Sequence, residues 1–255
     1  MYVMVTQIPE GKTNHGRIIY GRATRHQDVR LCCVGGLSFY LQYRFWVSGE
    51  FKDFTLEDWQ DNKKWFDVKL LVDVYGRGTN VDSMRNDSYG KILKKILVKL
   101  SLSCEKLLHL GRGLGAKLLE LLSEEIEEIR RMGWWNIGVY DNSYSGKIPL
   151  GPIMKLAGCS NLYQLVRGNV DVPEDLLRAT PMGSWCYEAL EELKEFTEGH
   201  TTAYQVLLFF CSINRICIQD AAAMAVLHPE RQEHCLYTIP CFRRDDFTVS
   251  FEFSG

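Results

Sequence analysis

The spacing of apolar and polar residues changes along the chain from a strand pattern to helical patterns. Residues 2–6 and 17–20 alternate on either side of a Pro- and Gly-containing turn at residues 9–12, and this predicts a β-hairpin. After Asp28, apolar residues recur every three or four positions, which predicts a helix that ends near Gly49. The chain is therefore expected to begin with a small sheet followed by a helix.

Helical spacing dominates the remaining sequence. It predicts helices over residues 88–100, 113–122, from 123 onward, 185–198 and 204–227. Pro149 and Pro152 are expected to interrupt the chain, the stretch between Pro173 and Pro181 resembles a linker, and the aromatic tail after Pro229 is expected to be an extended arm. We predict a mainly α fold with a small β-hairpin or sheet, divided into residues 1–172 and a helical extension, 173–255.

Composition narrows the class of protein. The chain has 255 residues, of which 46% are hydrophobic, enough for a substantial core. The apolar run at residues 206–211 is far shorter than the roughly 20 residues of a membrane span, so no membrane role is expected. The nine cysteines form no CxxC pair, which favours reduced core thiols, and we expect no cofactor and no metal, including at His228, His234, Cys235 and Cys241.

The net charge of −2 hides a strong asymmetry along the sequence. Residues 85–117 contain eight Lys or Arg and two acids, whereas residues 171–198 contain eight acids and two bases. Charge runs of this kind are common on solvated helix faces. They also allow one basic face to meet a polyanion while the rest of the surface stays acidic.

Three glycines stand beside a histidine and an arginine in the stretch His109-Leu-Gly-Arg-Gly-Leu-Gly115. Neither GxGxxG after a strand nor GxxxxGK[ST] is present, which argues against a nucleotide loop. The glycines are instead expected to allow close backbone approach at a helix start. His109 and Arg112 are one helical turn apart, so both side chains could reach one phosphate, the imidazole as acid or base and the guanidinium as a bidentate donor.

In this context the chain resembles the tyrosine recombinases and integrases. In that family a hairpin lysine, a His-x-x-Arg pair, a His or Trp and a tyrosine nucleophile surround the scissile phosphodiester. By this resemblance, Lys12 matches the hairpin lysine, His109 and Arg112 match the pair, and Trp135 and Tyr144 match the last two positions. The resemblance implies a tyrosine-recombinase-like catalytic-domain fold followed by a helical C-terminal extension.

A narrower resemblance covers most of the chain. Gly11-Lys-Thr13, Arg25-His26, Gly133-Trp-Trp-Asn136, Lys155-Leu-Ala-Gly158 and the block from Arg215 to Asp220 are similar to the recombinase-derived fungal family of large DNA-binding subunits of the point-centromere complex. That family is similar in turn to Crypton recombinases. It implies a nuclear protein at the centromere and kinetochore that binds double-stranded centromeric DNA, forms homodimers and meets other centromere-complex subunits and the chaperone of the centromeric histone.

The sequence departs from the recombinase pattern at its beginning. The family's first active-site arginine lies on a helix before the hairpin, and the chain starts too late to contain it, as if an N-terminal part were missing. Without that guanidinium, cleavage would lose transition-state stabilisation often worth roughly 100-fold or more in rate. DNA binding needs phosphate contacts alone. We therefore expect no enzyme activity, with the recombinase-like positions inactive.

The predicted DNA-contacting residues are basic side chains of the hairpin region and of the two central helices. Each of them alone is also typical of a solvated surface, as Trp135 and Tyr144 alone are typical of packed aromatics. Two other functions stay open: an active Crypton-like recombinase that cleaves DNA through Tyr144, and a protein-interaction module without nucleic acid. The DNA-contacting set is Lys12, Arg17, Arg22, Arg25, His26, Lys91, Lys94, Lys95, His109, Arg112 and Lys117.

Overall fold

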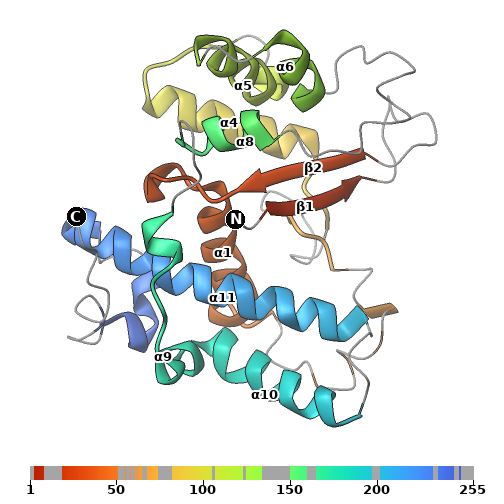
Figure 1. The fold of residues 1–255 in the computed structure, drawn as a ribbon, viewed down its shortest axis with the longest axis vertical. Helices are drawn as coiled ribbons and strands as arrows, with labels where there is room; N and C mark the ends of the chain where they lie inside the picture. The colour runs from red at the N-terminus through yellow and green to blue at the C-terminus, as the bar shows by residue number, and fades with distance from the viewer. Residues whose placement is uncertain are drawn as a thin grey trace. The chain divides into compact units, whose positions relative to one another are not determined.

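The computed structural model describes residues 3–8, 19–50, 55, 58, 61, 63–64, 68–73, 82–104, 107–122, 125–133, 150–159, 165–196, 202–231, 235–243 and 247. Its elements are mostly helices, with one two-stranded sheet among the described residues (Figure 1). The predicted fold class, mainly α with a small sheet, is confirmed. The chain forms two compact units, Met1–Gln60 with Ala157–Gly255, and Asp61–Leu156. The predicted division between residues 172 and 173 stays a prediction, since these contacts group the chain differently.

The predicted hairpin opens the first unit. β1 (Val3–Ile8) pairs antiparallel with β2 (Ile19–Thr24), and the register runs from Val3 opposite Thr24 to Ile8 opposite Ile19. β2 continues four residues beyond the predicted end at Tyr20, because its partner strand reaches back to Val3. The predicted turn lies outside the described residues.

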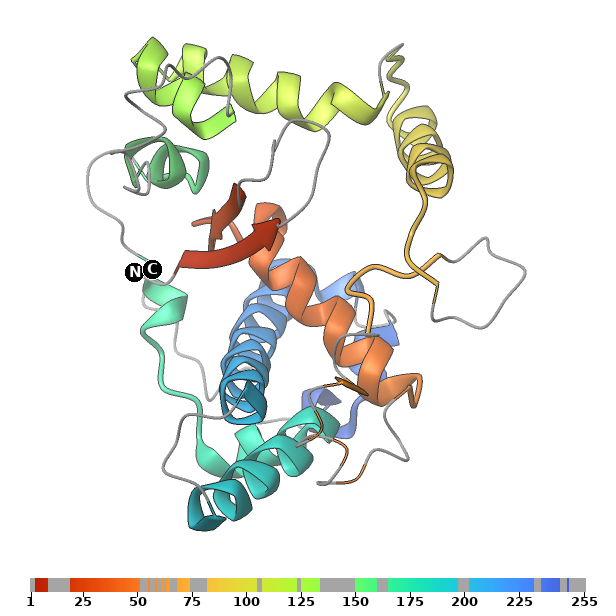
Figure 2. The ribbon, with the colours of Figure 1, turned by 90° about the vertical axis from the view of Figure 1, so that its right-hand side faces the viewer.

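The helix predicted after Asp28 is present and packs against the longest helix that the structure describes. A short 3-10 turn, η1 (Val29–Leu31), leads into α1 (Cys33–Leu41), which continues as a π-helical segment, η2 (Gln42–Val47). Gly49 follows with φ +79°, a conformation that favours glycine and ends the helix as predicted. α1 packs against α11 (Thr202–Leu227), which crosses the unit beside it (Figure 2).

The stretch expected to be a linker is helical. α9 (Glu174–Ala179) begins directly after Pro173, and α10 (Pro181–Phe196) begins with Pro181 as its first residue. Proline suits a helix start because its fixed φ is helical and its missing N–H has no partner there. Leu176 and Leu177 are buried against α11, so hydrophobic burial outweighs the breaking effect of the two prolines.

The tail after Pro229 is not an extended arm where the structure describes it. It folds into 3-10 turns, η5 (Pro229–Arg231), η6 (Cys235–Thr238) and η7 (Pro240–Arg243). The Tyr237 hydroxyl donates to the carbonyl oxygen of Ala221 in α11 at 2.9 Å. Three of the aromatic residues that suggested an arm, Tyr237, Phe242 and Phe247, are core residues, packed with α9 and α11. The core of this unit includes Cys217, Ile218, Ala221, Ala222, Tyr237, Ile239, Phe242 and Phe247.

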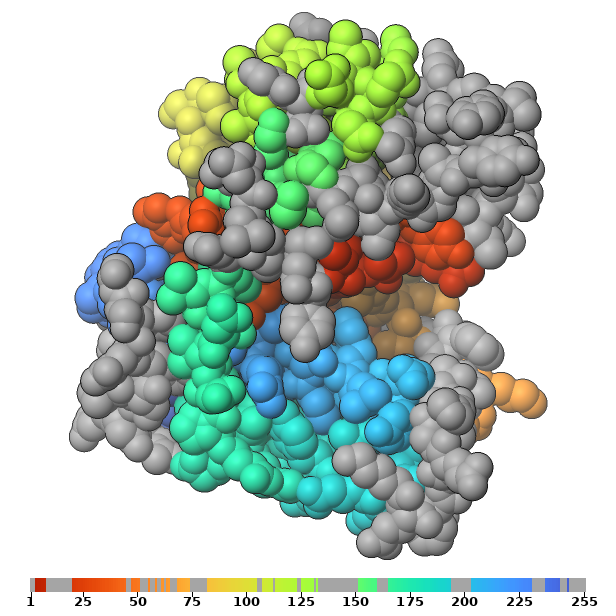
Figure 3. All heavy atoms as spheres, viewed as in Figure 1, coloured from red at the N-terminus to blue at the C-terminus, as the bar shows by residue number. Residues whose placement is uncertain are grey.

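The second unit has a small core and an open surface. Its buried apolar side chains among the described residues are Val72, Leu119, Ile129 and Ile153. The predicted helix over residues 88–100 is confirmed, and the helix predicted at 113–122 begins three residues earlier than expected. α5 and α6 lie at the surface on the face drawn in Figure 3. The helices are α4 (Asn86–Lys99), the 3-10 turn η3 (Leu107–His109), α5 (Leu110–Leu121), α6 (Ile126–Gly133) and α8 (Leu150–Leu156).

Pro152 lies within α8 and does not interrupt it. It occupies the first turn, where backbone N–H groups have no carbonyl partner inside the helix, so the ring removes no hydrogen bond. The side chain of Lys155 donates to the carbonyl oxygen of Leu122 at 3.0 Å and ties α8 to the end of α5.

One helix, Ala203–Leu227, is long and apolar enough to cross a membrane by length and composition alone. The short apolar runs in the sequence therefore underestimate the apolar length of this helix. Two thirds of its apolar window is buried inside the unit, and Asn214, Gln219 and Asp220 are buried along it with hydrogen bonds to other segments. These features are those of a core helix.

Gly35 and Gly36 in α1 provide a matched test of helix packing. A Cβ at Gly35 would lie 2.0 Å from Oδ2 of the buried Asp220, whereas a Cβ at Gly36 would meet open space. We expect Gly35→Ala to lower the free energy of unfolding by about 1–3 kcal/mol through overpacking. Gly36→Ala should raise it by about 0.5–1 kcal/mol through helix propensity. Urea denaturation measures both, and equal effects would contradict the close approach of α1 to α11.

Candidate nucleic-acid interface

A lysine face runs along α4 in the second unit. Lys91, Lys94, Lys95 and Lys99 are exposed, and Asp87 is the single acid of the helix. Ser88 in the first turn is fully buried and Ile92 is half-buried, whereas all four lysines are exposed to solvent. Four ammonium groups within three helical turns create a positive potential that attracts a phosphate backbone.

The start of α5 holds the predicted His-x-x-Arg pair. His109 is exposed, ends η3 and caps α5, while the side chain of Arg112 lies outside the described atoms. Lys117 is exposed and paired with Glu120 at 2.9 Å, so it contributes little net positive charge. The sequence places both residues of the pair in the first turn.

The expected role of the three glycines is wrong. Gly111, Gly113 and Gly115 all lie inside α5, and a Cβ at any of them would meet open space. Among the described residues, no neighbour comes within 4 Å of such a Cβ. Alanine is the better helix former at open positions, so these glycines reduce the stability of the first turns of α5.

The structure does not describe most of the recombinase-like positions, so it does not test whether they lie close together. Lys12, Arg17, Trp135 and Tyr144 all lie outside the described residues. Arg22 is in β2 opposite Val5 and is half-buried. The roles assigned to these residues by resemblance stay predictions.

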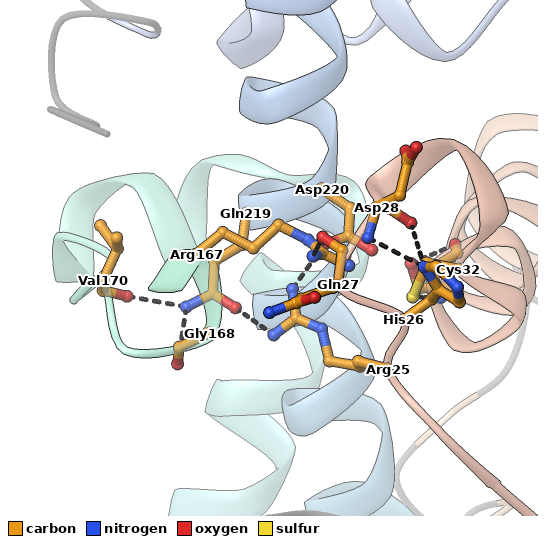
Figure 4. Close-up of polar contacts among 12 residues, drawn as sticks. Arg25, His26, Gln27, Asp28, Cys32, Arg167, Gly168, Val170, Gln219 and Asp220 are labelled. Carbon is orange, nitrogen blue, oxygen red and sulfur yellow. Dashed lines mark hydrogen bonds and ion pairs between the residues drawn. The ribbon is translucent and has the colours of Figure 1, made fainter. Parts of the chain in front are cut away.

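Arg25 is buried in the first unit, where its guanidinium binds other side chains. Nη2 donates to Oδ1 of Asp220, and Nη1 donates to Oε1 of Gln219 at 2.6 Å (Figure 4). The residue is 6% exposed. Its predicted contact with DNA phosphate stays untested, but the geometry gives its guanidinium an internal role.

A second guanidinium meets the same carboxylate. Arg167 lies in the 3-10 turn η4 (Val166–Gly168), and its Nε donates to Oδ1 of Asp220 at 2.7 Å. Its Nη1 donates to the carbonyl oxygen of Gln27 at 2.6 Å. Arg167 is 5% exposed and Asp220 is fully buried. Two buried guanidinium groups thus share one carboxylate, which joins η4, α11 and the segment after β2.

Gln219 extends this buried network toward the loop after η4. Its amide oxygen accepts from Arg25, and its Nε2 donates to the carbonyl oxygen of Val170 at 2.7 Å. Both ends of the amide are therefore used, and the side chain fixes Arg25 relative to the loop after η4. Gln219 and Asp220 were noticed in the sequence as part of a family block. Arg167 was missed, because nothing near it in sequence marks it as the partner of a residue 53 positions away.

His26 is half-buried between these anchored residues. The backbone N–H of Asp28 donates to its Nδ1 at 2.9 Å. Gly158 lies against the ring with φ +84°, and a Cβ there would be 3.0 Å from Cε1 of His26. The imidazole is therefore held in place by backbone on two sides.

The cysteines of the described residues are free thiols, in agreement with the expected reduced core. Cys186 in α10 and Cys211 in α11 lie with their sulfur atoms 3.5 Å apart, and their contact and burial raise the pKa of the Cys186 thiol. In the part of the chain that the structure describes, no three His, Cys, Asp or Glu side chains form a group that could hold a metal ion. The buried thiols are Cys32, Cys159, Cys186, Cys211, Cys217 and Cys241.

Fold and surface define a mainly helical protein that displays a lysine-rich helix on a chain of almost balanced charge. The chain belongs to the family described as centromere DNA-binding protein complex CBF3 subunit, domain 2, whose model matches residues 1–248. No curated protein and no solved structure matches it. The predicted resemblance to the centromere-complex subunit is thereby confirmed, whereas a recombinase fold and ancestry stay predictions.

The two guanidinium groups at Asp220 predict an order of stability. Asp220→Asn would leave both arginines buried without a counter-charge, and we expect it to cost about 3–5 kcal/mol. Arg167→Met would leave a neutral Arg25–Asp220 pair and one carbonyl without its donor, at about 1–3 kcal/mol. Urea denaturation ranks the two, and an Arg167→Met variant as unstable as Asp220→Asn would contradict this account.

Proposed function

We propose that the chain binds double-stranded centromeric DNA through phosphate contacts, as a catalytically inactive scaffold for kinetochore assembly. The observation that carries the proposal is the exposed lysine face of α4 in a member of a centromere DNA-binding family. The lysines would release counterions from the duplex, which makes affinity depend steeply on salt. Binding of this kind positions a protein on DNA and reads little sequence.

The proposal includes partners and a location. We infer a nuclear protein at the centromere that forms homodimers and contacts other subunits of its complex and the chaperone of the centromeric histone. The acidic face of α10, with Glu188, Glu191 and Glu192 exposed, is suited to basic protein surfaces and would repel DNA. The opposite charges of α4 and α10 thus support separate roles in binding DNA and binding protein.

The salt dependence of DNA binding tests the lysine face. Each phosphate contact contributes about 0.9 to the slope of log K against log salt, so Lys94→Gln with Lys95→Gln should reduce the slope by about 2 and weaken binding. Lys63→Gln with Lys64→Gln is the matched control, since both lysines are exposed in the same unit but outside the predicted set. Fluorescence anisotropy with a labelled duplex measures both variants.

Two results would contradict this proposal. Equal slopes for the two double variants would remove α4 from the interface. The absence of binding by the unaltered chain at low salt would remove DNA binding altogether and favour the protein-interaction module.

A nicked suicide duplex separates the scaffold from an active recombinase. We expect no covalent protein–DNA adduct after incubation, because a scaffold that holds duplex DNA by phosphate contacts forms no covalent bond with it. The products are separated by denaturing gel, with Tyr144→Phe as the control. An adduct that forms with the unaltered chain and disappears with Tyr144→Phe would establish Tyr144 as a nucleophile and overturn the inactive assignment.

A further inference from the structure

The segment that follows the hairpin is anchored on both sides of its backbone. The N–H of Gln27 donates to the carbonyl oxygen of Ala157 at 2.7 Å, and the carbonyl oxygen of Gln27 accepts from Arg167 Nη1 at 2.6 Å. Both backbone hydrogen-bonding groups of Gln27 are thus fixed by parts of the chain more than 100 residues away. A loop fixed in this way presents its neighbours in one orientation.

Arg167 links this anchor to the core. The same guanidinium that holds Gln27 also binds Asp220 through Nε at 2.7 Å. Asp220 is fully buried in the last third of α11, which packs against α1, α9 and α10, so the position of Arg167 is set by the core of the unit. The planar guanidinium fork reaches two acceptors at once, which a lysine ammonium on a flexible stem does not reproduce.

The residues that benefit from this anchor are predicted DNA contacts. His26 precedes Gln27 directly, and Arg22 stands in β2 three residues before Arg25. Thr24 and Arg25, which lie between Arg22 and His26 in the sequence, are buried. The two candidate DNA contacts are therefore attached to a part of the backbone that is fixed in the core. In this segment Arg25 acts from inside the core, while Arg22 and His26 keep part of their surface open.

We propose that Arg167 is a positioning residue for DNA binding, which acts by holding the Arg25–Asp28 segment so that Arg22 and His26 face duplex phosphates. This inference rests on the proposed function, because it names how one part of the DNA-binding surface is oriented. Arg167 itself touches no phosphate in this account. It spans the distance from the carboxylate of Asp220 to the backbone of the DNA-contacting segment.

Arg167→Met is the direct test, because its removal leaves the Arg25–Asp220 pair intact and balanced in charge. Loss of the Gln27 anchor should weaken duplex binding by roughly tenfold or more, since one charge-assisted contact is worth about that factor. The slope of log K against log salt should fall by about 1, for the phosphate contact of the Arg22 guanidinium. Arg167→Lys should keep the charge and lose most of this effect on orientation, so its binding should resemble that of Arg167→Met.

Asn214→Ala is the matched control for stability. Asn214 is fully buried in the same helix, donates to the carbonyl oxygen of Leu177 and accepts from Thr180, and none of these groups belongs to the segment after β2. The variant should lower the urea midpoint and leave the DNA affinity and its salt slope unchanged. If Arg167→Met does not fold, Arg167→Lys carries the comparison with Asn214→Ala.

The histidine NMR signals report the orientation separately. In Arg167→Met and Arg167→Lys the ring signals of His26 should shift, whereas those of His109, exposed in the other unit, should not. Unchanged affinity and slope in the Arg167 variants, or the same losses in Asn214→Ala, would overturn the positioning role. Failure of the unaltered chain to bind the duplex would instead overturn the proposed function, so the two failures are distinguishable.

Discussion

The pairing of the buried Asp220 carboxylate with two guanidinium groups is the interaction on which the first unit depends. A charge in the core is costly unless it is paired, and here two guanidinium groups from different parts of the chain supply the pairing. The two arginines in turn reach this carboxylate only if the segment after β2, η4 and α11 meet at one place. The close approach of α1 follows as well, since Gly35 leaves the room that the second carboxylate oxygen occupies.

The helices were largely predictable because their signals are local. In α4, the apolar and lysine positions alternate with helical spacing, so its bounds were predicted to within two residues. The errors arose where tertiary burial decides. The aromatics of the tail carry no strand or helix period, and only α11 reveals that Tyr237 and Phe242 are core residues. Pro173 and Pro181 resemble linker signals in the sequence, because their role at helix starts depends on the burial of the leucines between them.

The residues of the candidate interface also differ in whether local sequence or tertiary contacts decide their exposure. The exposure of Lys94 and Lys95 follows from helical spacing and was predictable, whereas the fate of Arg25 was not. In the sequence it is one of several basic residues of a hairpin region, yet its guanidinium is committed to a carboxylate 195 positions later. Arg167 had no sequence signal at all, since its value comes from two acceptors that the fold brings to it. Long-range pairing of this kind needs the structure.

The 195 positions between Arg25 and Asp220 also affect the order in which the two units can fold during synthesis. The hairpin and Arg25 leave the ribosome long before Asp220 is made, and all of residues 61–156 is made in between. Units with few distant contacts can fold as they emerge, but this one closes only when α11 is complete. Until then the two arginines stay hydrated and the apolar faces of α1 and α9 lack their main partner. The second unit, continuous in sequence, is free to form first.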